Sequence, residues 1–302
     1  MGDKSYVAAV VENLRRAETH IGTEFEDDLD STVATVSRTP RYAVMPVPGR
    51  IEVVTTTEGV RAFYESSRKI FQPLATRHRA QIVSDWFVFL EGMPTRRNQE
   101  SGKEYTINTT VLFPTTEDGI VGEFLWERSS EVADAPRDDP ERPDLPLRAV
   151  RNLRLHDEVV DALRSGEVEH IVQLLADDCL WAVRSYLPDS AEYPMVQAEG
   201  RSAVEEYLRA WRSTVIVDDL TVLNRVATDW YVFAEYVSHV RRAGKSDLEQ
   251  LRVASILPID NNGKIQGELG YGTDPVSNAV VPYRGGGYAH WARSEFRDPF
   301  FP

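Results

Sequence analysis

Two segments of the chain, separated by 144 residues, repeat one aromatic pattern. Residues 84–92 read SDWFVFLEG and residues 228–236 read TDWYVFAEY, so an Asp-Trp pair, a Val-Phe pair and a Glu recur at a constant offset (229 − 85 = 144). Apolar and polar side chains alternate after the tryptophan, and aromatic and β-branched residues are frequent. This pattern is typical of a strand with one buried face.

A second pair of matching segments lies further along the chain. Residues 112–124 (LFPTTEDGIVGEF) resemble residues 256–269 (ILPIDNNGKIQGEL), and Glu123 falls on Glu268 after one insertion. Asp-Gly and Asn-Gly at the corresponding turns are strong hairpin signals. The second match therefore also joins strand segments of two similar units.

A third match joins residues 57–71 with residues 198–212, each of which has Glu-Gly at its second and third positions. Three matches in the same order indicate a tandem duplication. A chain of 302 residues is long enough for two domains that each bury a core. We therefore expect two units of similar fold.

Composition restricts the partners and the compartment. The net charge of −14 argues against nucleic acid or an anionic membrane as a partner, because both attract clusters of Lys and Arg. No apolar run approaches the roughly 20 residues of a membrane helix. The N-terminal segment resembles an amphipathic helix rather than a signal peptide, so we expect a cytoplasmic protein. Cys179 is the single cysteine, and we expect a buried structural thiol there.

The order of elements predicts the α+β class, with helices followed by long antiparallel strands in each half. We expect domains at 1–128 and 150–273, a Pro- and Asp-rich linker at 129–149, and an aromatic tail at 274–302 that docks on the body. In the first half we expect helices at 6–20, 27–36 and 58–71 and strands at 41–47, 51–57, 77–91, 104–113 and 119–126. In the second half we expect helices at 151–165, 168–175 and 202–215 and strands at 179–186, 219–226, 230–240, 248–257 and 264–270.

Three short motifs resemble a known family. The sequence EGRSAVEEYLRAW resembles the start of the third helix of SnoaL-like domains, TRHRAQIV the strand that follows, and DGIVGEFLWE the final strand. SnoaL-like domains belong to the cone-shaped NTF2-like fold, and the resemblance covers residues 5–128 and 150–273. The family includes ketosteroid isomerases, scytalone dehydratases, polyketide cyclases, epoxide hydrolases and non-enzymatic modules, so the fold does not fix the function.

The resemblance implies a deep apolar pocket with one or two acid–base groups and no cofactor. It places a proton-abstracting histidine at His78, oriented by an acid of the run at residues 26–30, with Asp28 and Asp30 first. Tyr42 or Tyr105 would stabilise a developing oxyanion. The alternative is that His78 is a half-exposed strand residue and that the acidic run is a solvated helix cap.

The second unit lacks an equivalent histidine, because the offset of 144 places Val222 at this position. We therefore expect the first unit to carry the chemistry. His156 is a candidate inward-facing polar residue of the first helix of unit two. The other polar candidates for a pocket in this unit are Tyr186, Tyr193, Tyr207, Glu235, His239 and Glu268.

These observations predict a cofactor-independent lyase or isomerase that acts on a small, mostly apolar carbonyl or cyclic substrate. No metal site is expected, since six scattered histidines lack H-E-x-x-H or any clustered ligand spacing. A non-catalytic ligand-binding or assembly module is the first alternative, with the two units as an internal pseudo-dimer or with the chain as a homo-oligomer. The other alternative is a hydrolase in which Asp28 or Asp30 activates water.

Overall fold

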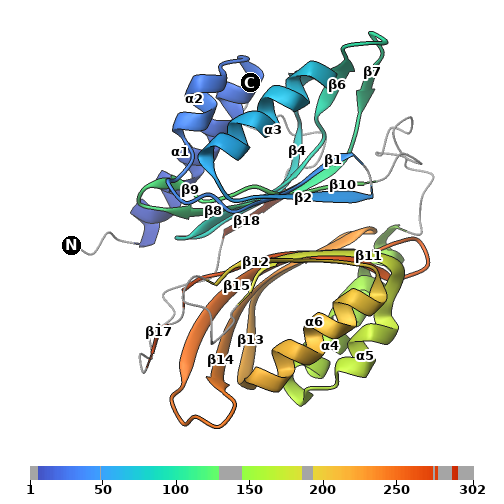
Figure 1. Cartoon of the computed structure of the whole chain (residues 1–302). Coiled ribbons are helices and arrows are strands. Elements are labelled where there is room, and N and C mark those ends of the chain that lie inside the picture. Colours follow the sequence, from blue (N-terminus) through green and yellow to red (C-terminus); the bar gives the residue numbers. More distant parts are fainter. Residues whose placement is uncertain are drawn as a thin grey trace. The chain divides into compact units, whose positions relative to one another are not determined.

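The computed structural model describes residues 6–47, 49–128, 145–185, 193–274, 276–277 and 288–291. The chain divides into two compact units: Met1–Asp139 with Arg284–Pro302, and Pro140–Tyr283. Each unit packs helices on one face of a curved sheet, so the predicted α+β class is confirmed (Figure 1). Most of the predicted linker and tail lies outside the described residues, and these boundaries remain predictions.

Unit one begins with two helices and ends with an added edge strand. Its main sheet has the order β18-β4-β5-β8-β10-β1-β2, with β9 paired to β8, and a small sheet has the order β3-β6-β7. The elements are α1 (Tyr6–Phe25), α2 (Leu29–Ala34), β1 (Tyr42–Val47), β2 (Arg50–Val54), α3 (Thr57–Ile70), β3 (Phe71–Ala75), β4 (His78–Val83), β5 (Phe87–Gly92), β6 (Thr95–Asn98), β7 (Glu104–Thr106), β8 (Thr109–Thr116), β9 (Gly119–Ile120), β10 (Phe124–Glu127) and β18 (Tyr288–Trp291).

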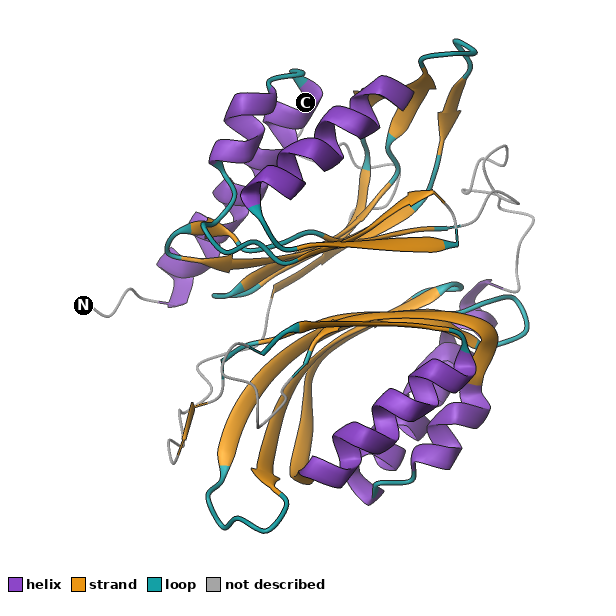
Figure 2. Ribbon diagram, viewed as in Figure 1, coloured by secondary structure: helices purple, strands orange, loops and turns teal. Residues whose placement is uncertain are grey.

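Unit two repeats this order with longer strands. Its sheet has the order β12-β11-β16-β15-β14-β13, with β17 paired to β15. The elements are α4 (Leu145–Ser165), α5 (Val168–Leu174), β11 (Leu175–Arg184), β12 (Met195–Glu199), α6 (Arg201–Thr214), β13 (Val215–Ala227), β14 (Tyr231–Arg242), β15 (Glu249–Pro258), β16 (Ile265–Gly272) and β17 (Val276–Ser277). Figure 2 shows the three helices of this unit lying within the curve of its sheet.

The long strands differ between the units in one respect. Each of β13, β14 and β15 in unit two corresponds, at the offset of 144, to a pair of shorter strands in unit one: β3 with β4, β5 with β6, and β7 with β8. One of the breaks falls at Met93-Pro94, and proline has no N–H to donate to a ladder. His78 is the first residue after another break, where it pairs with Gly92. The breaks therefore place His78 at the junction between the small sheet, which contains β3, and the main sheet, which contains β4.

The first helix of each unit is fixed to the sheet by the same buried amide. Asn13 donates from Nδ2 to the Ser84 carbonyl at 3.0 Å, and Asn152 donates to the Thr228 carbonyl at 2.8 Å. Both acceptors precede the repeated Asp-Trp pair. The helices α1 and α4 thus align at an offset of 139 (152 − 13). Residues at equivalent positions of the two units can therefore be compared directly.

The two equivalent helices α3 and α6 begin differently. Thr56 caps α3 by accepting the Gly59 N–H at 3.0 Å, whereas α6 follows Gly200, whose φ of 82° suits glycine. Both helices have 14 residues and their bounds differ by 144. The sequence match between 57–71 and 198–212 was therefore out of register by three residues.

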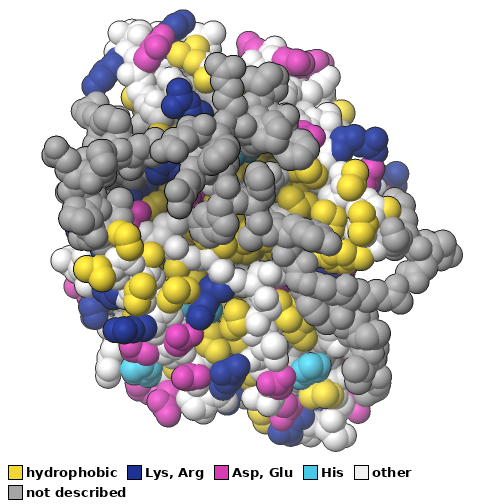
Figure 3. All heavy atoms as spheres, turned by 180° about the vertical axis from the view of Figure 1, so that it is seen from behind, with side chains coloured by type: hydrophobic (Ala, Val, Ile, Leu, Met, Phe, Trp, Pro, Cys, Tyr) yellow, Lys and Arg dark blue, Asp and Glu magenta, His cyan; other side chains and the backbone are white. Residues whose placement is uncertain are grey.

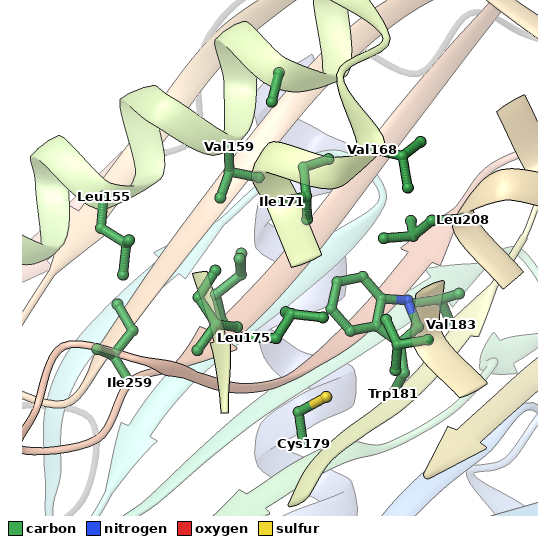
Figure 4. Close-up of a cluster of buried hydrophobic side chains, with 14 of the residues drawn as sticks. Leu155, Val159, Val168, Ile171, Leu175, Cys179, Trp181, Val183, Leu208 and Ile259 are labelled. Atoms are coloured by element: carbon green, nitrogen blue, oxygen red, sulfur yellow. The ribbon is translucent and has the colours of Figure 1, made fainter. Parts of the chain in front are cut away.

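The core of unit two lies between its helices and its sheet (Figure 4). Trp181 and Leu208 contribute large side chains to it, and Cys179 is fully buried there. Burial raises the pKa of the Cys179 thiol, and Asp178 and Asp177 add to this, while Arg201 opposes it. The thiol is buried, as the sequence predicted.

Three strand predictions need correction or extension. Residues 104–113 do not form one strand, because β7 ends at Thr106 and β8 begins at Thr109. Residues 77–91 do not form one strand, because Ser84-Asp85-Trp86 makes a turn between β4 and β5, closed by the Ser84 N–H to the Phe87 carbonyl at 2.9 Å. Beyond the second unit, β18 pairs antiparallel with β4, and Trp291 lies opposite Ala80. This strand becomes the edge of the sheet in unit one.

The surface carries both acidic and basic side chains, as expected for a chain whose net charge is −14. On the face shown in Figure 3, the basic side chains of the described residues lie among acidic ones. Among the helices that the structure describes, none is long and apolar enough to cross a membrane.

Candidate functional site

Unit one contains a cavity of about 150 Å³ between α1, α3 and the concave face of its sheets. Most of the wall is apolar, with Phe63 and Phe113 among the aromatic side chains. Its polar wall consists chiefly of Glu24, Tyr64, Ser67, Arg68, Thr76, His78, Arg96, Thr109, Glu123 and Glu127. The unit therefore has a partly open, largely apolar cavity with several ionisable groups on its wall, which is a common form of small-molecule site.

Three buried side chains and the partly exposed Glu24 form one hydrogen-bonded network. The Tyr64 hydroxyl lies 2.7 Å from Glu24 Oε1 and 3.0 Å from Glu123 Oε2. His20 Nε2 lies 3.0 Å from the same hydroxyl and 3.2 Å from Glu24 Oε1. His20 is fully buried, whereas the Glu24 side chain is 25% exposed because it faces the cavity.

The positions of the protons follow from the partners. The Thr35 hydroxyl donates to the Thr32 carbonyl at 2.6 Å, so its oxygen can only accept from His20 Nδ1 at 2.5 Å. His20 therefore carries a proton on Nδ1. The Tyr64 hydroxyl has one proton and its shorter contact is to Glu24. Its contact with Glu123 is then best satisfied when Glu123 is protonated and donates.

The pKa values of the two glutamates move in opposite directions. Burial and the neighbouring charge of Glu24 raise the pKa of Glu123 to about 7. Burial would also raise the pKa of Glu24, but the hydrogen bond and charge of His20 outweigh it, and the net shift is downward. Burial opposes the charge on His20, yet its bond to Glu24 raises the pKa of the imidazole. One carboxyl group is thus held ionised while the other changes protonation near neutral pH.

A cation and a further acid lie on the same wall. Arg96 forms an ion pair with Glu127, and the Arg96 side chain is 21% exposed. The positive charge of Arg96 also acts on Glu123 and Glu24, lowering the pKa of each. The cavity therefore combines a fixed cation with a carboxyl group that titrates near neutrality.

The structure brings only part of the sequence-predicted site together. His78 is half-buried and lines the cavity of unit one. Asp28 caps α2, accepting from the Ser31 N–H at 3.0 Å and its hydroxyl at 2.6 Å. Asp30 is 87% exposed in its side chain and pairs with Arg61 at 2.6 Å. Neither aspartate lines the cavity, so the acid–histidine pair at this site is Glu24 with His20.

The two tyrosines predicted for an oxyanion lie beside the cavity wall. Tyr42 is fully buried in a cluster with Tyr64, and burial followed by the charges of Glu123 and Glu24 raises its pKa well above the ordinary value. Tyr105 stacks edge-on against Phe71 and is half-buried. Neither residue is part of the cavity lining, so Tyr64 is the tyrosine whose hydroxyl meets the cavity.

His20, Glu24 and Glu123 are the described residues that could hold a metal ion, since their ligand atoms lie within 4.8 Å of one another. The raised pKa of His20 favours an imidazolium ion, which offers no lone pair to a metal. Its nitrogens are also both engaged, by Thr35 and by Tyr64 with Glu24. The arrangement suits a proton network better than a metal centre.

Unit two has its own cavity, also of about 150 Å³, with a different wall. At the offset of 139, Val159 replaces His20 and Leu163 replaces Glu24, and at 144 Leu208 replaces Tyr64. Glu268, the counterpart of Glu123, remains, and its carboxylate accepts from the Ser255 hydroxyl at 2.7 Å. Burial raises the pKa of Glu268 to about 7.

The candidate residues of unit two lie in different environments. Tyr207 and Glu268 line the cavity, and His156 is buried against Tyr236. Glu235 is buried and pairs with Arg252 at 3.1 Å, and His239 lies 3.7 Å from Asp219. Tyr186 lies outside the described residues.

The acid–histidine pair of unit one was not predicted from the sequence. His20 and Glu24 are four residues apart on α1, which places them on one helix face. A sequence signal also existed for the buried acids, because Glu123 and Glu268 were matched in the repeat. The third group, Tyr64, lies at a position that only the correct register of α3 reveals.

The fold consists of two α+β units, each with a partly open, mostly apolar cavity. The family model described as "SnoaL-like domain" matches residues 156–267. Unit two therefore carries a SnoaL-like domain, as the motifs predicted. No curated protein matches the chain.

Solved structures of similar fold include an LEH-like epoxide hydrolase of M. tuberculosis (15% identity, TM-score 0.33, 41% of this chain and 84% of that chain). A second is assigned as a ketosteroid isomerase of Kribbella flavida (17%, 0.31, 45% and 85%). A third is a computationally designed 17-OHP binder (13%, 0.35, 42% and 98%). At these identities the likeness concerns the fold alone.

Proposed function

We propose that unit one is a cofactor-independent isomerase or lyase that moves a proton on a small, mostly apolar carbonyl or cyclic compound. The observation that carries this proposal is that Glu123, which is buried, and Glu24, which is partly exposed, both contact the Tyr64 hydroxyl while their pKa values shift in opposite directions. An acid–base group works best when its pKa lies near the working pH, and about 7 for Glu123 meets that condition.

The roles follow from the protonation states. Glu123 as a carboxylate takes a proton from a carbon next to a carbonyl, and the electrons of the C–H bond move towards the carbonyl oxygen. As a carboxylic acid it returns the proton to another carbon in an isomerisation, or to a leaving group in an elimination. Glu24 and His20 form an ion pair of zero net charge beside Glu123. The negative charge of Glu24 raises the pKa of Glu123 and so keeps it basic. Arg96 and His78, on the same wall, are the candidates to meet the oxyanion.

The cavity also supports a limit on substrate size. An engineered cavity of about 150 Å³ in another protein holds benzene, and the cavity of unit one has about this volume. The enclosed part of a substrate is then of the order of one six-membered ring. Cyclic enones and small ketones are suitable first probes.

The test is exchange of α-hydrogens in D2O, followed by NMR with a set of small cyclic ketones and enones. Glu123→Gln should lower the exchange rate by about 10²- to 10⁴-fold, the usual contribution of general acid–base catalysis. Glu117→Gln, at the exposed turn after β8, is the matched control and should exchange like the wild type. Full exchange in Glu123→Gln would remove the proposed role of Glu123.

His78→Gln separates the sequence prediction from the structural one. If His78 is the base, this variant loses exchange to the same extent as Glu123→Gln. If His78 only contacts the oxyanion, the loss is smaller and depends less on pH. Addition of a chelator should leave the wild-type rate unchanged, because the proposed steps use protons alone.

Hydrolysis of an epoxide is the second candidate, favoured by the coexistence of an ionised Glu24 and a protonated Glu123 on one cavity wall. Glu24 would accept a proton from water as the water oxygen bonds to a ring carbon. The C–O bond would break, and Glu123 would give its proton to the leaving oxygen. Incorporation of ¹⁸O from water into a diol supports this reaction. A protein that binds the probes without exchange or hydrolysis is a binding module.

A further inference from the structure

In each unit the turn after the first helix contains a residue with positive φ, and an arginine lies against it. This residue is Asp27 in unit one, with a φ of 59°, and Gly166 in unit two, with a φ of 80°, so the two positions differ by the offset of 139 (166 − 27). The arginines are Arg68 and Arg212, in the last turns of α3 and α6, and they differ by the offset of 144 (212 − 68). The same pair of positions therefore meets in both units.

In unit two the guanidinium occupies the space that a side chain at position 166 would need. A Cβ added to Gly166 would lie 2.8 Å from Cζ of Arg212, which is closer than such atoms pack. Arg212 Nη1 donates to the Val215 carbonyl at 3.4 Å, and Arg212 is not among the described residues that line the cavity. The arginine of unit two thus lies on the turn and at the helix end, where a cation also complements the helix dipole.

In unit one the side chain of residue 27 fills that space, and the arginine lies elsewhere. Arg68 Nη1 donates to the Asp27 carbonyl at 3.0 Å and lies 3.1 Å from Asp27 Oδ1. Arg68 also lines the cavity. Its side chain is 19% exposed and that of Asp27 is 77% exposed, so the guanidinium lies at the rim, between the cavity and solvent. The Cβ of Asp27 therefore accounts for the placement of Arg68 on the cavity wall.

One terminal nitrogen of Arg68 has no acceptor. Nη2 is buried and makes no hydrogen bond to any of the residues that the structure describes. A buried donor without a partner is unfavourable, and more so when it belongs to a charged group. The ion pair with Asp27 satisfies the charge only weakly, because the carboxylate is exposed to water. The guanidinium can therefore still bind an anionic group.

The other charges around this cavity are paired with one another. Arg96 forms an ion pair with Glu127, and Glu24 forms one with His20. Glu123 changes protonation near neutral pH, because burial raises its pKa to about 7. Arg68 differs from Arg96 in that its counter-ion is on the solvent side. It is therefore the cation of the described wall that is best placed to meet a ligand at the rim.

We propose that Arg68 binds a carboxylate group of the substrate at the rim of the unit-one cavity, with the ring of that substrate inside the cavity. Hydrogen bonds between a guanidinium and a carboxylate are among the stronger ones in proteins. The substrate class is then a small cyclic ketone or enone that carries a carboxylate. This proposal deepens the function proposed for unit one, and it rests on that function for the carbonyl group alone.

The experiment is an NMR titration of the whole chain with 4-oxocyclohexanecarboxylate and with the neutral 4-oxocyclohexanecarboxamide, followed at the methyl signals of Ile21, which lines this cavity. The wild type should bind the carboxylate about 10-fold more tightly, the lower end for a hydrogen bond between charged groups, because the rim is open to water. Arg68→Gln should lose this preference and keep its amide affinity within about twofold. The ratio of the two ligands within one variant is insensitive to a partial loss of folding. Arg212→Gln, the matched control in unit two, should keep the preference.

Two substitutions of residue 27 separate shape from charge. Asp27→Gly gives unit one the turn of unit two, so the guanidinium can lie over the turn as Arg212 does, and the preference for the carboxylate should largely disappear although Arg68 is intact. Asp27→Asn keeps the Cβ and tolerates a positive φ, but it removes the competing carboxylate. Its preference should equal or exceed that of the wild type.

The role of the base is tested separately from that of Arg68. Glu123→Gln should keep the preference for the carboxylate while it loses exchange of α-hydrogens, so failure of one proposal is distinct from failure of the other. Equal affinity of the wild type for the two ligands, or an unchanged preference in Arg68→Gln, would overturn the proposal.

Discussion

The two cavities occupy the same place in two copies of one fold, yet they hold different chemistry. Unit one surrounds Glu123 with His20, Glu24 and Tyr64, and the equivalent positions of unit two are Val159, Leu163 and Leu208. The buried glutamate itself is retained as Glu268. Duplication thus kept the titrating acid and changed the groups that decide what the acid can do.

The two sets of residues also differ in what they contribute to stability. An ion pair such as that of the buried His20 with the partly exposed Glu24 contributes little net stability, because desolvation offsets the attraction, but removal of one partner leaves an unpaired charge. Unit two avoids this cost with apolar residues at both positions. The pair in unit one is therefore better explained by function than by stability.

The largest expected effect comes from converting unit one into the chemistry of unit two. At the offset of 144, Val111 corresponds to Ser255, the residue that donates to Glu268. The variant His20→Val, Glu24→Leu, Tyr64→Leu, Val111→Ser should lose about 10²- to 10⁴-fold of any proton-exchange activity. It should still fold, with an unfolding free energy within about 2 kcal/mol of the wild type, because both charges leave together.

Glu24→Leu alone is the matched comparison for that variant. It leaves the buried His20 without its acidic partner. The unfolding free energy should fall by about 3–5 kcal/mol, measured by calorimetry on the unit-one transition. Equal stability of the single and the combined variant would show that His20 and Glu24 do not act as a charged pair.

An intermediate effect concerns the pH dependence of stability in unit two. The folded pKa of Glu268, about 7, is above the ordinary 4.5. Between these values the folded protein holds a proton that the unfolded chain releases, so stability falls as the pH rises through this window. Glu268→Gln should remove about 3 kcal/mol of that fall, because one pKa unit corresponds to about 1.36 kcal/mol.

Calorimetry at pH 4 and pH 8 measures this change. The contribution of His156, whose lowered pKa acts in the opposite direction, is present in both proteins and cancels from the comparison. An unchanged pH slope in Glu268→Gln would mean that the carboxyl group is solvated.

The smallest expected effect tests what the units share. Asn13→Ala and Asn152→Ala each remove the amide that joins the first helix to the turn before the repeated tryptophan. Each should cost about 1–3 kcal/mol, because a buried carbonyl loses its donor. Glu65→Ala, on the exposed side of α3, should stay within about 0.5 kcal/mol. A large difference between the two asparagine variants would argue against equivalent roles.

The sequence anticipated the cavity wall only in part. His78 was found from its position at the start of a strand, and it lines the cavity. Asp28 and Asp30 were chosen because they lie near the second helix, but capping and a surface ion pair hold them outside. Sequence proximity to a pocket element does not tell which way a side chain points, and a helix N-terminus competes for an acidic side chain.

The repeat, the α+β class and the SnoaL-like motifs were determined by the sequence itself, because the periodicity of apolar residues and the turn signals are local properties. The network of His20, Glu24, Tyr64 and Glu123 was decided only by the tertiary structure. It joins two residues of α1 to one of α3 and one just before β10, separated by up to 103 positions (123 − 20). Their pKa values depend on mutual distance and on exclusion of water, and both arise only when the helices close over the sheet.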